Sequence, residues 1–276
     1  RADLQNVLAE AAEAAGCAVQ LGVDLQSIEA EPGRVRAVVN QQGQLIAHGA
    51  DVLVGAAGVR SAVRGHLGLS APPVFARRLA YRATVDAPEG FPAEVRLYLA
   101  RDAHVVVYPV CGGKTVNIVA IVKETRPVAR WSAPGDSATI HAAFQGWTSE
   151  VRTLLSSASH FLCWGLYDIA PLARWGDGRV TLLGDAAHAM LPFLAQGAAQ
   201  AIEDAAALAT ALSRESEAPA ALRAYEADRR GRTARIQTEA RRNGLVYHLS
   251  GPPRFARDLV LRRGSGDKLL DRYGWI

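Results

Sequence analysis

The chain has 276 residues, with 31 Lys and Arg against 27 Asp and Glu, and a hydrophobic share of 49%. This composition is typical of a folded globular protein and excludes disordered, collagen-like and low-complexity classes. No apolar run reaches the roughly 18–20 residues of a membrane-spanning helix. The three cysteines are isolated, which argues against a disulfide scaffold or a metal site and favours a cytoplasmic protein.

The first 55 residues predict one helix followed by short strands. An apolar stripe with helical spacing covers residues 2–16. The polar turn Gln41-Gln42-Gly43 indicates a hairpin, and the apolar run that ends at Gly55 is typical of a buried parallel strand. The expected strands are 18–23, 34–40, 45–48 and 51–55.

The segment from about residue 79 to residue 122 is predicted to form an antiparallel sheet. Apolar and polar residues alternate there, and turn residues separate the runs, as in a sheet with one covered face. The expected strands are 80–85, 94–99, 104–110 and 115–122.

The last part of the chain is predicted to return to strand and helix. A buried strand that begins at Arg179 runs directly into a turn at Gly184 and Asp185. The expected elements are a helical stretch at 137–158, a strand at 161–167, helices at 196–213 and 219–242, and a short final helix. We therefore expect an α/β domain whose sequence is interrupted by a sheet domain.

Arginines concentrate in the second of these long helices. Acidic residues are interleaved with them, and no aromatic stacking pattern accompanies them, so the stretch indicates a solvated helix face rather than a nucleic-acid surface. The arginines are Arg229, Arg230, Arg232, Arg235, Arg241 and Arg242.

The most specific signal is the string from Leu183 to Ala205, LGDAAHAMLPFLAQGAAQAIEDA. A strand ends at Gly184-Asp185, a loop containing Pro192 follows, and a helix opens at Gln196. Small residues let the backbone approach a flat or anionic ligand closely, and the free N–H groups of a helix start favour negative charge. The Asp185 carboxylate is placed to accept hydrogen bonds from ligand hydroxyls.

This string resembles the GD motif of FAD-dependent aromatic hydroxylases, the group A flavoprotein monooxygenases that include salicylate hydroxylase and para-hydroxybenzoate hydroxylase. In that family the Asp binds the ribityl chain of FAD, and the Pro-x-x-x-Gln-Gly-Ala turn lies beside the isoalloxazine ring. The resemblance implies a cofactor site at Gly184, Asp185, Pro192, Ala195, Gln196, Gly197 and Ala198.

Other strings support the resemblance along the whole chain. Arg1-Ala-Asp-Leu resembles a helix start whose Arg reaches the flavin, and residues 50–64 resemble the second fingerprint, the DG motif. The implied fold is α/β (α+β), with a Rossmann-like FAD/NAD(P)-binding domain of the para-hydroxybenzoate hydroxylase type. It lacks the first βαβ unit of that domain, so we expect a fragment of a longer protein. The expected parts are residues 1–72 for FAD binding, 73–175 for an antiparallel substrate domain, and 176–276 for the return to the FAD-binding domain.

Three positions depart from the family pattern. The Asp of the DG motif is Ala57, the Arg of Asp-Arg-x-Pro is Ile169, and the Pro that follows the GD-motif His is Ala189. The first two positions serve cofactor and nicotinamide binding in the family, so we expect weaker binding of the reductant.

The sheet segment carries a second motif, His104-Val-Val-Val-Tyr108-Pro109. Alternate residues of a strand share a face, so His104 and Tyr108 point the same way. A His and a Tyr on one face can bind and deprotonate a phenol, and the salicylate-like enzymes have the same string. The alternative is a structural His on the sheet.

The resemblance implies an enzyme that uses FAD, NADH or NADPH, and O2 to hydroxylate a small phenol or salicylate-like aromatic acid through a flavin C4a-hydroperoxide. His104 would be the base, while Tyr108 and Gln196 would position the substrate. Two alternatives stay open: another flavoenzyme of this fold, such as a halogenase or reductase, and a truncated chain that is only an interaction module. We expect no metal, nucleic-acid or membrane partner, and a homodimer stays open.

Overall fold

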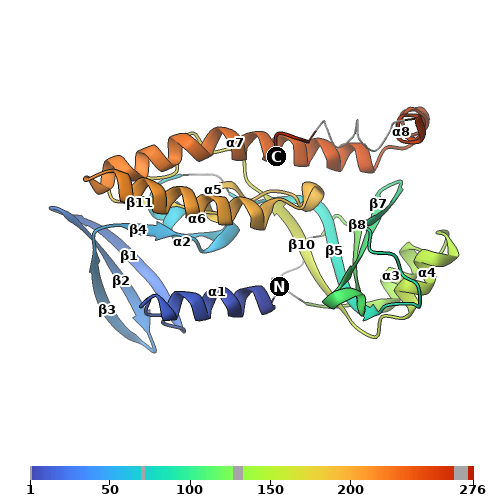
Figure 1. Ribbon diagram of the computed structural model, residues 1–276, viewed down its shortest axis with the longest axis horizontal. Coiled ribbons are helices and arrows are strands. Elements are labelled where there is room, and N and C mark those ends of the chain that lie inside the picture. The colour runs from blue at the N-terminus through green and yellow to red at the C-terminus, as the bar shows by residue number, and fades with distance from the viewer. Residues whose placement is uncertain (1, 70–71, 127–132, 264–272) are drawn as a thin grey trace.

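A computed structural model describes residues 2–69, 72–126, 133–263 and 273–276. The chain forms a part built from helices and two small sheets and a part built on a six-stranded sheet, and a long helix runs along both (Figure 1). Within the described ranges, no helix has the length and apolarity needed to cross a membrane.

The N-terminal elements are a helix and a three-stranded antiparallel sheet of order β1-β2-β3. Positive φ angles at Gln42 and Gly43, 52° and 86°, make the tight turn of the predicted hairpin. The strand expected at 18–23 is wrong, because β1 begins only at Val23, where pairing with Gln41 of β2 begins. These elements are α1 (Ala2–Ala14), β1 (Val23–Glu31), β2 (Arg34–Gln41) and β3 (Gln44–Ala50).

Two short parallel strands form the centre of the first part. β4 (Leu53–Gly55) pairs with β11 (Val180–Leu182), which confirms the expected buried parallel strand. A side chain at Gly55 would bring its Cβ within 2.6 Å of the Cβ of Val63, so glycine allows β4 to pack against α2 (Ala62–His66). The loops that follow both strands leave the same edge, where ligands bind in open α/β sheets.

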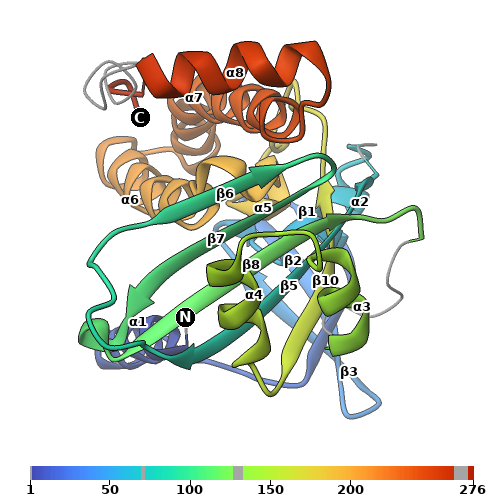
Figure 2. The same ribbon diagram turned by 90° about the vertical axis from the view of Figure 1, so that its right-hand side faces the viewer.

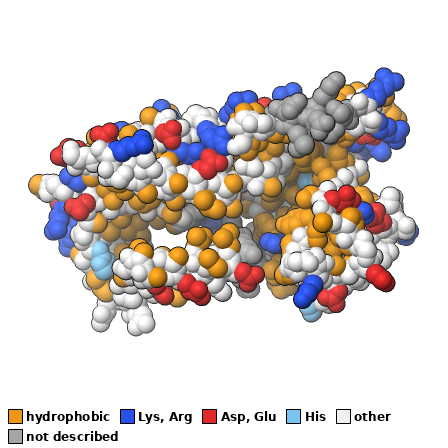
Figure 3. Space-filling view, viewed as in Figure 1, with side chains coloured by type: hydrophobic (Ala, Val, Ile, Leu, Met, Phe, Trp, Pro, Cys, Tyr) orange, Lys and Arg blue, Asp and Glu red, His pale blue; other side chains and the backbone are white. Residues whose placement is uncertain are grey.

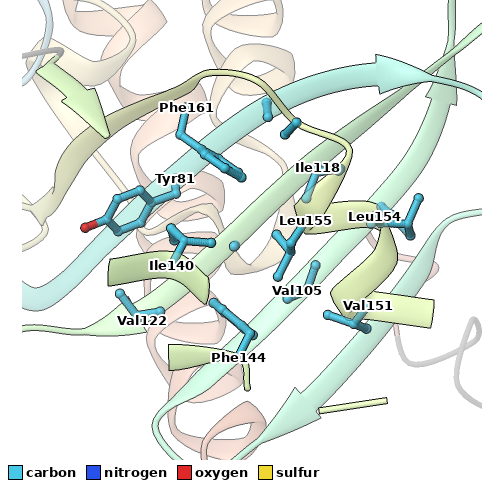
Figure 4. Close-up of a cluster of buried hydrophobic side chains, with 14 of the residues drawn as sticks. Tyr81, Val105, Ile118, Val122, Ile140, Phe144, Val151, Leu154, Leu155 and Phe161 are labelled. Atoms are coloured by element: carbon cyan, nitrogen blue, oxygen red, sulfur yellow. The ribbon is translucent and has the colours of Figure 1, made fainter. Parts of the chain in front are cut away.

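The six-stranded sheet has the order β6-β7-β8-β5-β10-β9, and its pairs are antiparallel. Figure 2 shows α3 (Ser137–Ala143) and α4 (Ser149–Ser156) on one of its faces. Figure 4 shows the core between them, where Ile140 and Leu155 meet Val105 and Ile118. The strands are β5 (Val74–Asp86), β6 (Arg96–Ala100), β7 (Ala103–Val110), β8 (Thr115–Lys123), β9 (Ala133–Gly135) and β10 (Phe161–Asp168).

The C-terminal helices are α6 (Gly197–Arg214), α7 (Ala218–Tyr247) and α8 (Pro252–Arg263), and α7 contacts both parts. Near its start, α7 places the Tyr225 hydroxyl 3.1 Å from the Leu182 carbonyl of β11, to which it donates. At its end, Tyr247 packs against the face of the sheet that α3 and α4 leave uncovered. Hydrophobic side chains line both sides of a hollow between α6 and α1 (Figure 3).

Candidate active site

Gly184, the first residue of the GD string, holds strand β11 close to helix α6. Its φ and ψ are 61° and −141°, a conformation that favours glycine. A Cβ there would lie 3.2 Å from the Cβ of Ala201. The Gly184 N–H donates to the Asp204 carboxylate at 3.0 Å, which ties the turn to the helix.

The predicted cofactor residues meet at the N-terminus of α6. Gln196 is the N-cap residue, and its own side chain does not cap the first N–H groups of the helix. The Asp185 carboxylate is exposed and close to Gly197, 3.9 Å from the position that a Cβ there would take. Ala195 has φ 53°, and it is exposed together with Pro192 and Ala198. Arg1 lies outside the described residues.

This donor set fits a flavin. An exposed carboxylate can accept hydrogen bonds from hydroxyl groups, the N–H groups at a helix start can donate to a polar ring edge, and small residues leave room for a flat ligand. All three features occur within the short loop that α5 (Asp185–His188) and η3 (Pro192–Leu194) form before α6.

A buried polar network lies beneath this loop, and the sequence did not predict it. Asp204 is fully buried and accepts from His188 Nε2 at 2.6 Å and from Arg229 Nε at 2.8 Å. Burial alone would raise the pKa of Asp204, but the hydrogen bonds from His188, Arg229 and Gly184 outweigh burial and lower it. The carboxylate is therefore charged and fixes both ends of the Gly184–His188 turn.

The DG segment is tied to the GD loop by Arg64, which is 5% exposed. Its Nη1 donates to the Ala186 carbonyl at 2.9 Å, and its Nη2 donates to the Val59 carbonyl. Ser61 caps α2 by accepting from the Arg64 N–H at 3.3 Å. The arginine thus holds the loops after β4 and β11 at a fixed spacing.

Two of the departures from the family pattern pack against each other. Ile169 and Ala189 are buried in one cluster with Val59. The side-chain amide of Gln237 donates to the carbonyls of both Ile169 and Ala189, at 3.0 and 3.1 Å. Nearby, Arg241 of α7 pairs with the Asp168 carboxylate at 2.5 Å. An apolar contact therefore stands where the family pattern has an Arg and a Pro, while a guanidinium from α7 faces Asp168.

The predicted substrate strand β7 brings His104 to the GD loop. His104 is 1% exposed, and its ring centroid lies 5.4 Å from the ring of Phe193 in η3. Tyr108 and Val106 share the face of His104, as period-2 spacing requires, and both are half-buried. Within the described ranges, no hydrogen bond joins Tyr108 or Gln196 to His104.

A second histidine fixes the proton positions on His104. His248 Nδ1 lies 2.5 Å from the Gly244 carbonyl, which can only accept, so Nδ1 carries the proton. His248 Nε2 then accepts from His104 Nδ1, 2.8 Å away. This leaves His104 Nε2 as a proton acceptor, and no described residue hydrogen-bonds to it.

Both histidines are neutral at physiological pH. Burial, His248 and Arg78 lower the pKa of His104 to about 3. Burial and Arg78 lower the pKa of His248 to about 4. Nothing in the sequence indicated this contact, because His248 lies beyond the helix predicted at 219–242 and far from His104 in the chain.

These depressed pKa values predict a stability that falls in acid. The unfolded chain takes up protons below about pH 6.5, whereas the folded His104 stays neutral to about pH 3, so protons favour unfolding in that window. Between about pH 7 and about pH 5, the free energy of unfolding should fall by on the order of 2 kcal/mol from His104. Chemical denaturation at both pH values measures the free energy of unfolding. If it falls as much in His104→Gln as in the wild-type protein, the prediction is contradicted.

The sequence matches the FAD binding domain family over residues 1–240. It is 35% identical to 3-hydroxybenzoate 6-hydroxylase 1 of Aquipseudomonas alcaligenes, over 100% of this chain and 70% of that protein. The chain spans 58% to 70% of the length of the first relatives that it matches.

Solved structures agree with this match. The substrate complex of a salicylate hydroxylase has a TM-score of 0.81 at 30% identity, covering 95% of this chain and 70% of that one. Klebsiella pneumoniae HpxO, complexed with FAD and uric acid, has a TM-score of 0.87 at 26% identity, covering 98% and 69%. The chain therefore belongs to the FAD-binding family of flavoprotein aromatic hydroxylases.

Proposed function

We propose that the protein is an FAD-dependent monooxygenase that hydroxylates the ring of a phenol or salicylate-like aromatic acid, using NADH or NADPH and dioxygen. The observation that carries this proposal is the contact between His104 and Phe193, because Phe193 belongs to the loop that resembles the flavin-binding GD motif. Relatives named as hydroxybenzoate hydroxylases support the aromatic substrate class.

Bound FAD would supply hydride acceptance from the nicotinamide and activation of dioxygen. The chain itself would hold the cofactor through the Asp185 carboxylate and the N–H groups of Gly197 and Ala198 at the start of α6. Phe193 and Val106 would exclude water from the ring.

His104 would move the proton that activates the substrate. A phenol becomes a stronger nucleophile when it loses its proton, and His104 Nε2 is the ring nitrogen that the tautomer arrangement leaves without a proton. The pKa of about 3 makes His104 a weak base before the substrate binds, so the transfer depends on the negative charge of the phenolate beside the ring, which would raise that pKa. The charge gained at Nε2 would be shared through Nδ1–H with His248 Nε2. Tyr108, on the same face, would position the ring by one hydrogen bond.

The reaction type is tested by the mass of the product. FAD-loaded protein with reductant and a hydroxybenzoate should oxidise the reductant faster than without the aromatic acid and add one oxygen to the ring. A halogenated product formed in the presence of a halide would favour a halogenase, and reductant oxidation that leaves the ring unchanged would favour a reductase.

The cofactor assignment predicts that Asp185→Ala weakens FAD binding. Charge-assisted hydrogen bonds from ribityl hydroxyls contribute about 1.5–3 kcal/mol, so the dissociation constant should rise by about 10- to 150-fold. Flavin fluorescence titration measures it. Asp177→Ala, an exposed carboxylate at the other end of β11, is the matched control and should bind FAD normally. Equal affinity in the two variants would remove Asp185 from the site.

A further inference from the structure

Arg82 lies on the same face of the large sheet as the predicted base. In the strand register, Arg82 of β5 is opposite Val119 of β8, and Val119 is opposite Val106 of β7. Directly opposed residues of antiparallel strands point to one face, and Val106 shares that face with His104. Val119 itself packs in the cluster that contains Phe193. The side chain of Arg82 therefore extends from the face of the sheet that forms one wall of the proposed substrate site.

The charge of Arg82 is not neutralised by a carboxylate. Its Nε donates to the amide oxygen of Asn117 at 2.6 Å, and Arg82 makes no salt bridge within the part of the chain that the structure describes. Two other arginines near this sheet are placed differently: Arg78 donates from its Nη1 group to the Asp102 carbonyl, and the guanidinium of Arg60 lies 5.9 Å from the Tyr167 ring. Arg82 is half-buried, so a ligand can reach it.

Asn117 orients the guanidinium for a flat anion. Because Nε is engaged by the amide oxygen, the remaining donors of Arg82 are the paired Nη groups, the edge that binds a carboxylate in a bidentate manner. Asn117 is fully buried, and its own Nδ2 has no hydrogen-bond partner. A buried amide donor without an acceptor is costly, and a ligand oxygen that approached it would remove that cost.

We propose that Arg82, held by Asn117, binds a carboxylate carried by the aromatic substrate. The inference rests on the proposed function and narrows it to aromatic acids. The ring would lie over Val106 and Val119 with its acid group at Arg82, and the hydroxyl on the neighbouring ring carbon would be on the side of that group nearer to His104. A neutral aromatic ring would lack the interaction with the guanidinium and would bind more weakly.

The test compares two ligands that differ by one charge. Dissociation constants for salicylate and for the uncharged salicylamide are measured by titration of the FAD-loaded protein. Arg82→Gln should weaken salicylate binding by about 10- to 150-fold, the usual range for a charge-assisted bond. Salicylamide binding should change by less than about 3-fold. Arg82→Lys should restore salicylate binding only in part, because an ammonium lacks the planar fork.

Asn117→Asp provides a second variant that keeps the shape of the sheet. It places a carboxylate against the Nε of Arg82, which neutralises the charge of the guanidinium within the protein. The variant should therefore lose its preference for salicylate but still bind salicylamide. Arg96→Gln, which removes a positive charge from the opposite face of the sheet, is the matched control and should keep that preference.

Parallel losses for salicylate and salicylamide in Arg82→Gln would overturn the inference, since they would show a general packing role. Wild-type protein that hydroxylates a phenol yet binds acid and amide equally would overturn it and leave the proposed function standing. Protein that binds FAD but neither aromatic ligand would overturn both.

Discussion

Replacing His104 with alanine should slow ring hydroxylation by about 10²–10⁴-fold, the usual size of a general-base contribution. Oxidation of the nicotinamide should survive, because that step does not need the phenol proton. The variant should therefore still consume reductant and dioxygen when the substrate binds, but release hydrogen peroxide in place of product. The ratio of product formed to reductant oxidised measures this coupling.

Two further variants separate a catalytic from a structural His104. Tyr108→Phe keeps the ring and loses one hydrogen bond, so it should mainly weaken substrate binding. His160→Ala removes an exposed histidine near the same sheet and should leave coupling unchanged. If His104→Ala lowers the melting temperature but keeps full coupling, His104 is structural and not the base.

Removing the carboxylate of Asp204 should lower the free energy of unfolding by about 3 kcal/mol, the lower end of the range for breaking a buried ion pair. The loss leaves the Arg229 guanidinium buried, with 6% exposure, and takes an acceptor from His188 and from the Gly184 N–H. The lower end applies because Glu203 still pairs with Arg229, at 2.7 Å. Chemical denaturation of Asp204→Ala measures the change.

The same experiment has an internal control in α7. Asp228→Ala removes an exposed carboxylate and should change the free energy of unfolding by less than about 0.5 kcal/mol. Replacing both buried partners, as in Asp204→Leu with Arg229→Met, should recover part of the stability, because no unpaired charge remains. If the double variant is no more stable than Asp204→Ala, the unpaired charge of Arg229 does not explain the loss of stability.

The sheet could be predicted from local pattern because its strands are long and alternate. His104 and Tyr108 share a face for that reason alone. The strand expected at 18–23 is wrong for a complementary reason: a strand needs a hydrogen-bonded neighbour, and β2 supplies one only from Val23 onward. Local apolarity does not reveal where pairing begins.

The long-range contacts of the site were harder to predict. Nothing local connects His104 with His248, or Asp204 with Arg229, because each pair joins elements far apart in the chain. One signal was available: Gln200 and Asp204 are polar residues with helical spacing on the face of α6 that becomes buried. A carboxylate at such a position needs a buried partner, and an arginine of the long basic helix supplies it.

The origin of the oxygen in the product tests the central claim most directly. FAD-loaded protein is supplied with NADH or NADPH, a hydroxybenzoate and isotopically labelled dioxygen. The mass of the aromatic product is then measured by mass spectrometry. A monooxygenase should place one labelled oxygen atom on the ring for each molecule of reductant oxidised. Product that carries oxygen from water, or reductant oxidation with no labelled product, would contradict the account.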